Sequence, residues 1–206
     1  MLKLPSDVIC LGLTGGPGVG KSTVRNKLAT LSFYAISADE IGHQILNSNK
    51  QVNAQLRALL GKEIFDGNGD LSRKIISLKV LSNPKLLKKY NKIIWPVLLR
   101  ELKKKIRTAI REGIKFIVVD AALIYEWGIE DWFTNIITVT SKKSVYTERL
   151  KMRGWSVSKI NKIVKAQIKL SEKAKRADFV ISNNGSLAAL MAKVNVLTEL
   201  ILIFKV

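Results

Sequence analysis

The chain has 206 residues, of which 47% are hydrophobic, and its formal net charge is +19. This length suits one α/β domain with an insertion or two small domains, and the hydrophobic share excludes a disordered chain. Cys10 is the only cysteine, which excludes a disulfide framework and a cysteine-based zinc site. A single cysteine is typical of a reducing compartment, so we expect a cytoplasmic protein; the N-terminal segment also lacks the pattern of a signal peptide. The charge is expected to attract polyanions such as nucleotides or nucleic acid, and charge alone does not choose among them.

The first predicted elements are a strand, a glycine-rich loop and a helix. The apolar run from Asp7 to Thr14 is typical of a buried strand, and helical spacing extends from Lys21 to Leu31. The loop between them matches G-x-x-x-x-G-K-[ST] at every fixed position, and the segment reads Gly15, Gly16, Pro17, Gly18, Val19, Gly20, Lys21, Ser22 and Thr23. In such a loop the backbone N–H groups point at phosphates, the lysine reaches the β- and γ-phosphates, and the serine hydroxyl ligates Mg²⁺. The motif therefore predicts a nucleoside-triphosphate site, without choosing between ATP and GTP.

A helical block interrupts the strands that follow. A short strand is expected at Phe33–Ile36, and "SADE" then begins a helix. From about 41 to 111 the pattern is helical, with breaks predicted at Gly61, "DGNGD" (66–70), Asn83-Pro84 and Pro96. We interpret this block as an insertion into the nucleotide-binding core.

Three further strands are predicted beyond the insertion, at Lys115–Asp120, Asn135–Thr140 and Ala177–Ser182. Helical patterns separate them, and this alternation predicts an α/β fold with a doubly wound parallel sheet. The apolar C-terminal stretch contains Lys193, Asn195 and Glu199. No uninterrupted run reaches the roughly 18 residues of a membrane span, so we expect a docked amphipathic helix and no membrane partner.

Four charged residues are candidates for the chemistry. Asp120 ends a strand, where P-loop proteins place an acidic residue of the magnesium shell; an ordinary strand-end aspartate is the alternative. Asp39 lies in the first turn of a predicted helix, where it either orients an acceptor hydroxyl or merely complements the helix dipole. Arg149 and Arg153 lie one turn apart on a predicted helix. They either cover the transferred phosphoryl group or belong to a solvated basic face.

Three classes of P-loop protein remain to be compared. A GTP switch is disfavoured, because no Asn-Lys pair of the chain is followed by the aspartate of the Asn-Lys-x-Asp guanine motif. A nucleic-acid-binding ATPase is favoured only by the net charge, and we expect no nucleic-acid partner. A small-molecule kinase fits best, with a nucleoside or nucleotide kinase as one alternative within this class.

At this point the chain resembles the dephospho-coenzyme A kinase family. The resemblance runs from "LGLTGGPGVGKST" to "ADFVISNNGS" and includes, in the family's order, "SADEIGH", "GKEIFDGNGDLSRKII", "SNPKLLKKYNKIIWP", "VVDAALIYE" and "ERLKMR". It implies a P-loop kinase fold in which 1–40 and 114–206 form the nucleotide-binding core, with a small lid at about 141–157. It also implies that the helical domain 41–113 binds dephospho-coenzyme A.

The resemblance further implies the reaction and the roles of the candidates. ATP, with Mg²⁺ held by Ser22 and Asp120, phosphorylates the ribose 3′-hydroxyl of dephospho-coenzyme A to give coenzyme A and ADP, the last step of coenzyme A biosynthesis. Asp39 faces that hydroxyl, His43 lies near the acceptor substrate, and Arg73 contacts the acceptor substrate. Lys21, Arg149 and Arg153 act on the phosphoryl group.

The chain departs from the family's usual residues at four places. Ser37 and Ser72 each replace an aspartate, Trp95 replaces a histidine, and the family's Asp-x-Pro-Leu-Leu-x-Glu run reads Asp-Ala-Ala-Leu-Ile-Tyr-Glu at 120–126. The candidate chemistry residues are retained, and the departures concern mainly the acceptor pocket. Neither the oligomeric state nor the nucleotide preference follows from the sequence.

Overall fold

The structure, a computed structural model, describes residues 2–66 and 69–204. The chain forms two compact units. The first consists of Met1–Ser37 and Lys105–Val206, and the second of Ala38–Lys104.

The first unit is built on a five-stranded parallel sheet with the order β2-β3-β1-β4-β5. The strands are β1 (Ile9–Gly15), β2 (Tyr34–Ser37), β3 (Phe116–Asp120), β4 (Asn135–Thr140) and β5 (Phe179–Ser182). All five predicted strands are therefore present, and the predicted doubly wound parallel sheet is confirmed. The central strand β1 is buried along its whole length, as expected for a parallel sheet covered on both faces. Strand order reverses at β1, so the carboxyl end of β1 is where such sheets bind ligands.

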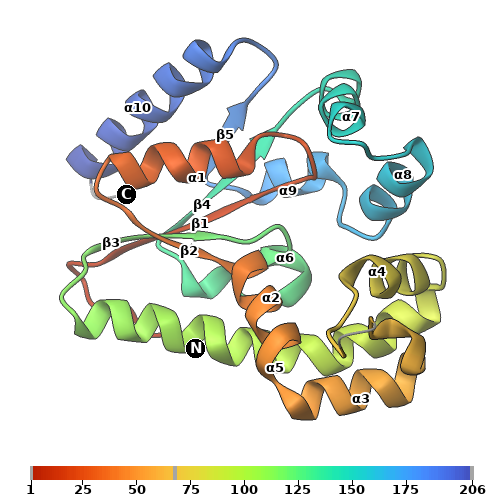
Figure 1. Ribbon diagram of the computed structural model, residues 1–206. Coiled ribbons are helices and arrows are strands. Elements are labelled where there is room, and N and C mark those ends of the chain that lie inside the picture. The colour runs from red at the N-terminus through yellow and green to blue at the C-terminus, as the bar shows by residue number, and fades with distance from the viewer. Residues whose placement is uncertain (1, 67–68, 205–206) are drawn as a thin grey trace. The chain divides into compact units, whose positions relative to one another are not determined.

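Helices cover both faces of this sheet. Helices α1 (Lys21–Thr30) and α10 (Leu187–Phe204) lie side by side on one face, and the C-terminal part of α5 (Pro84–Arg111) covers the other, as Figure 1 shows. Shorter helices follow β3 and β4: α6 (Ile124–Trp127), α7 (Lys143–Met152), α8 (Val157–Lys165), α9 (Leu170–Arg176) and a 3₁₀ turn, Glu130–Trp132. The core joins Leu11 and Ile137 of the sheet to Leu28 of α1 and Val194 of α10. Within 2–66 and 69–204, no helix is long and apolar enough to cross a membrane.

The second unit is helical. It contains α2 (Ala38–Ser48), α3 (Lys50–Leu60), a 3₁₀ turn (Lys62–Ile64), α4 (Arg73–Leu81) and most of α5. Ser72 accepts a hydrogen bond from the N–H of Ile75 at 3.4 Å, and serine and aspartate serve equally well as N-caps. In the predicted turn at 66–70, the Asp70 N–H donates to the Asp66 carboxylate at 3.0 Å, while 67–68 lie outside the described residues.

The break predicted at Pro96 was wrong, because α5 continues through this residue from Pro84 to Arg111. A proline inside a helix loses one backbone hydrogen bond and costs about 3 kcal/mol. Pro96 is exposed, so its ring does not disturb the packed side of the helix. On that side Ile94, Leu98 and Leu102 are buried, and burying such a side chain contributes about 1.5–3 kcal/mol. Burial of this face thus offsets the cost of the proline.

Candidate active site

The glycine-rich loop connects β1 to α1 at the carboxyl end of the sheet. Gly18 has φ +73° and Gly20 has φ +95°, and side chains rarely adopt either conformation. A Cβ at Gly18 would lie 2.8 Å from the carbonyl oxygen of Tyr146, and one at Gly20 would lie 2.3 Å from Nδ2 of Asn183. The loop is therefore packed on one side by α7 and by the segment after β5.

Lys21 and Asp120 meet beside this loop. The Lys21 ammonium group contacts Oδ1 of Asp120, and Nη1 of Arg25 lies 3.7 Å from Oδ2 of the same carboxylate. The pairing of β1 with β3 places Leu13 opposite Asp120, which brings the strand end to the glycine loop. The Asp120 side chain is 5% exposed and the Lys21 side chain 12%. A buried carboxylate paired with two cations is thus positioned where the triphosphate of a nucleotide would lie.

The segment after β3 is held by a buried ion pair that the sequence did not reveal. Nζ of Lys173, on α9, lies 2.8 Å from Oε1 of Glu126 and donates to the Ala122 carbonyl oxygen at 2.6 Å. Oε1 of Glu126 also accepts from the N–H of Ile168 at 2.8 Å. Desolvation lowers the pKa of Lys173, and the neighbouring Lys21 lowers it further, whereas Glu126 opposes the shift. This ion pair anchors the segment that directly follows Asp120, the last residue of β3.

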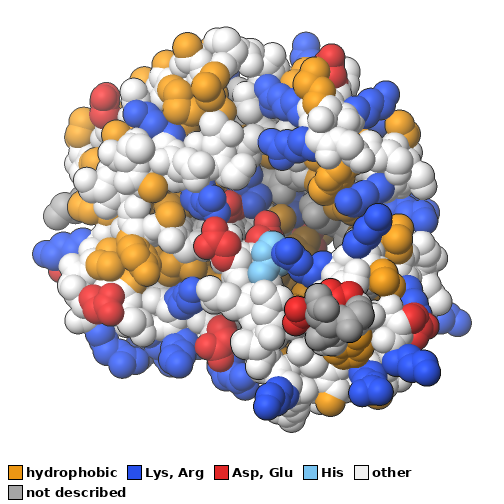
Figure 2. Space-filling model, in the orientation of Figure 1, with side chains coloured by type: hydrophobic (Ala, Val, Ile, Leu, Met, Phe, Trp, Pro, Cys, Tyr) orange, Lys and Arg blue, Asp and Glu red, His pale blue; other side chains and the backbone are white. Residues whose placement is uncertain are grey.

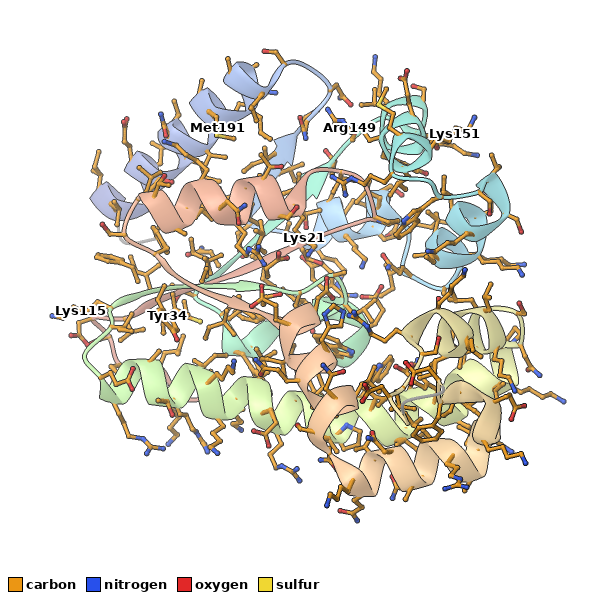
Figure 3. All side chains as sticks on the ribbon, in the orientation of Figure 1. Lys21, Tyr34, Lys115, Arg149, Lys151 and Met191 are labelled. Atoms are coloured by element: carbon orange, nitrogen blue, oxygen red, sulfur yellow. The ribbon has the colours of Figure 1, made fainter. Side chains whose placement is uncertain are left out.

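Arg149 and Arg153 have different surroundings. Nη1 of Arg149 donates to the carbonyl oxygen of Asn183 at 3.2 Å and Nη2 donates to its Oδ1 at 3.4 Å. Arg153 is the exposed C-cap residue of α7. Figure 3 shows Arg149 on α7 and Lys21 at the start of α1, near the carboxyl ends of β4 and β1. Arg149 is thus attached to the sheet, and the guanidinium of Arg153 faces solvent.

The other predicted site residues lie on helix ends and helix surfaces. Ser22 and Thr23 are in the first turn of α1, and Ser22 is exposed. Asp39 and His43 belong to the second unit, where both are exposed and one turn apart on α2, so they share a face of that helix. Arg73, also exposed, is the first residue of α4.

Burial raises the pKa of the Cys10 thiol to about 12. The thiol therefore stays protonated at neutral pH, and only the thiolate is nucleophilic. Cys10 is not a candidate for catalysis.

Sequence reasoning missed three residues of this site. Asn183 lies in "SNNGS", which the pattern alone describes as a surface loop, and Lys173 lies in the basic run "KLSEKAKR", which is typical of a solvated helix. Arg25 follows Lys21 by one helical turn. This spacing could have indicated that the two side chains share one face of α1.

Comparison with known proteins gives the family of this arrangement. The model of the dephospho-CoA kinase family matches residues 9–189. A dephospho-CoA kinase of Fusobacterium nucleatum subsp. nucleatum is 36% identical over 203 residues, covering 95% of this chain and 100% of that protein.

Two solved structures are also similar. The crystal structure of TT1252 from Thermus thermophilus has a TM-score of 0.75 and 28% identity, covering 94% of this chain and 98% of that one. Dephospho-CoA kinase from Campylobacter jejuni has a TM-score of 0.68 and 24% identity, covering 92% and 95% of the two chains. The latter identity supports the likeness of fold alone.

Proposed function

The chain belongs to the dephospho-CoA kinase family and is a kinase, and we propose that it transfers the γ-phosphoryl group of ATP to the ribose 3′-hydroxyl of dephospho-coenzyme A. The products are coenzyme A and ADP, and the reaction is the last step of coenzyme A biosynthesis. The observation that carries the proposal is the glycine loop with Lys21 and Asp120 beside it, in a chain that matches the family from residue 9 to residue 189.

Lys21 and the loop N–H groups bind the phosphates in this proposal. The Lys21 ammonium contacts Asp120, which keeps a nearly buried cation paired. When ATP binds, its β- and γ-phosphates offer the same ammonium stronger acceptors. Nη1 of Arg25, 3.7 Å from Oδ2 of Asp120, provides a second cation beside this carboxylate. The site is thus preorganised for a polyanion.

The donor set fits Mg²⁺. This ion prefers hard oxygen ligands and is usually held by one or two protein side chains together with substrate phosphates. Asp120 and Ser22 provide such a pair, and within the described ranges no group of three His, Cys, Asp or Glu side chains offers an all-protein site. Held by Asp120 and Ser22, Mg²⁺ would neutralise part of the negative charge on the phosphates.

The acceptor side is assigned to the second unit. Asp39 is an exposed carboxylate two residues after Ser37, the last residue of β2, and Ser37 pairs in register with Asp120. We assign to Asp39 the alignment and deprotonation of the 3′-hydroxyl. His43, on the same helix face, and Arg73 are assigned to contacts with the acceptor. The helical unit accordingly has the role of the acceptor-binding domain.

The arginines act at the phosphoryl group and exclude water. Charge on the transferred group is spread over its oxygens in the transition state, and arginine side chains stabilise it there. We assign this role to Arg149 and Arg153, in a lid at about 141–157. Exclusion of water also prevents hydrolysis of ATP. The exposed guanidinium of Arg153 has the freedom to close on a bound substrate, whereas Arg149 is already held by Asn183.

The test is a product assay with a panel of acceptors. The purified chain is incubated with MgCl₂, with ATP or GTP, and with dephospho-coenzyme A, adenosine, AMP or shikimate as the acceptor. We expect mass spectrometry and ³¹P NMR to detect a 3′-phosphate only on dephospho-coenzyme A. Phosphorylation of a different acceptor, with dephospho-coenzyme A left unchanged, would contradict the proposal. The cytoplasm is the proposed location of this reaction, in keeping with a chain whose only cysteine is a free thiol.

A further inference from the structure

Asn183 links three separate segments of the first unit behind the glycine loop. It follows β5 directly and is 6% exposed. Its Nδ2 donates to the carbonyl oxygen of Val19 at 2.8 Å, and its backbone N–H donates to the carbonyl oxygen of Thr140 at 2.8 Å. Arg149 donates to both its carbonyl oxygen and its Oδ1. One side chain thus contacts the glycine loop and α7 at the same time.

The orientation of this amide is determined by its two partners. The Val19 carbonyl oxygen can only accept a hydrogen bond, so it requires the NH₂ end of Asn183. The Arg149 guanidinium can only donate, so it requires the oxygen end. A carboxylate in this place would satisfy Arg149 but would set a second oxygen against Val19. Among side chains of this size, asparagine is therefore the one that meets both demands.

The hydrogen bond to Val19 also orients the Gly20 N–H group. In a planar trans peptide the C=O and N–H groups point in opposite directions. Because the Val19 carbonyl points at Asn183, the Gly20 N–H points to the side of the loop opposite Asn183. The φ of +95° at Gly20 and the 2.3 Å that would separate a Cβ there from Nδ2 show how closely the two residues pack. Without this bond, the flexible Val19–Gly20 peptide could rotate and turn a carbonyl oxygen toward the phosphates.

We propose that Asn183 is a positioning residue for phosphoryl transfer: it aims the Gly20 N–H at the triphosphate and holds the guanidinium of Arg149 beside the same loop. The inference rests on the proposed function, because it requires a nucleotide at the loop. It gives a role to "SNNGS" that the motif itself does not indicate. The neighbouring Asn184 strengthens the docking, since its Oδ1 accepts from the Lys142 N–H at 2.7 Å, immediately before α7.

The test compares Asn183→Asp with Asn183→Ala. If Asn183 only fills space, the aspartate, which has nearly the same volume, is the milder change. If Asn183 orients the peptide, the aspartate is the more harmful, because it repels the Val19 carbonyl and adds a negative charge near the phosphates. Asn195, which is exposed on α10, provides matched controls in Asn195→Asp and Asn195→Ala. Circular dichroism and melting temperature verify that each variant folds.

Binding of ATP, ADP and adenosine is measured for every variant by calorimetry or by displacement of a fluorescent nucleotide. We expect Asn183→Ala to raise Kd for ATP and ADP about 5- to 15-fold, the effect of one hydrogen bond, and to leave adenosine within twofold. We expect Asn183→Asp to raise Kd for ATP at least 30-fold, and kcat/KM to fall in parallel. The Asn195 variants are expected to match the wild type.

Two results would overturn the inference. One is an Asn183→Asp variant that binds ATP as well as Asn183→Ala does. The other, which needs only the alanine variant to fold, is an equal loss of affinity for ADP and adenosine, because a general distortion of the site weakens both. Failure of the wild-type chain itself to bind ATP would instead contradict the proposed function.

Discussion

Replacement of Lys173 by methionine tests whether the buried ion pair stabilises the site. The Lys173 side chain is 1% exposed and Glu126 is 11% exposed. Methionine keeps most of the volume but removes the ammonium, so Glu126 retains only the Ile168 N–H of the two donors described above. Removal of one partner of a buried pair costs about 3–5 kcal/mol. Because Thr14 also donates to the Ala122 carbonyl, at 3.0 Å, that oxygen stays satisfied, and we expect the lower part of this range.

A loss of about 3 kcal/mol corresponds to a fall in melting temperature of roughly 6–12 °C for a chain of this length. Urea unfolding and thermal melting measure it. Lys175→Met is the control, because Lys175 lies on the same helix, is 74% exposed and forms an ion pair with Glu172 at 3.3 Å. We expect this exposed pair to contribute less than about 0.5 kcal/mol.

A second change identifies the source of the loss. Adding Glu126→Gln to Lys173→Met removes the unpaired charge, and we expect the double variant to recover about half of the stability. The reasoning fails if Lys173→Met costs less than about 1 kcal/mol, if Lys175→Met costs as much, or if the double variant is no more stable than the single one.

Four further outcomes are expected. Lys21→Ala should abolish phosphoryl transfer. It should also lower stability by about 1–2 kcal/mol, because the buried Asp120 loses its contact with Lys21 and keeps the more distant Arg25. A folded variant with full activity would refute the assignment of the site. Asp39→Asn should lower kcat about 10²–10⁴-fold with ATP affinity unchanged, and a rate within threefold of wild type would remove its catalytic assignment. The pKa of Lys173 is lowered in the folded protein from its ordinary 10.5. Between these two pKa values the unfolded state binds more protons than the native state, so the stability of wild type relative to Lys173→Met should rise with pH. Urea midpoints of both proteins at pH 7 and 9.5 measure this difference. Duplex DNA should bind weakly and lose affinity steeply as salt rises, because the net charge of +19 attracts phosphates without reading a base sequence; many Lys and Arg side chains are seen on the visible face (Figure 2). Tight, sequence-selective binding would contradict this.

The sequence by itself determined the sheet and the phosphate loop. Both depend on local patterns: five apolar runs bounded by glycines or polar residues, and one loop whose glycines and lysine stand at fixed spacing. The ends of the strands were predicted within two residues, since burial in a parallel sheet leaves little choice of composition. For Asp120 the sequence indicated a position at a strand end, and its contact with Lys21 of the loop is visible only in the structure.

Tertiary structure decided what holds this site together. Asn183 and Val19 are 164 residues apart, and Lys173 and Glu126 are 47 apart, so no local pattern connects the members of either pair. A basic residue in a basic helix predicts exposure, and Lys173 is buried only because α9 packs against the sheet, where Glu126 is available to pair with it. Pro96 follows the same principle in the second unit, where burial of Ile94 and Leu98 outweighs a local preference for a break. Local preferences are worth about 1–3 kcal/mol each, and the burial of a packed face exceeds them.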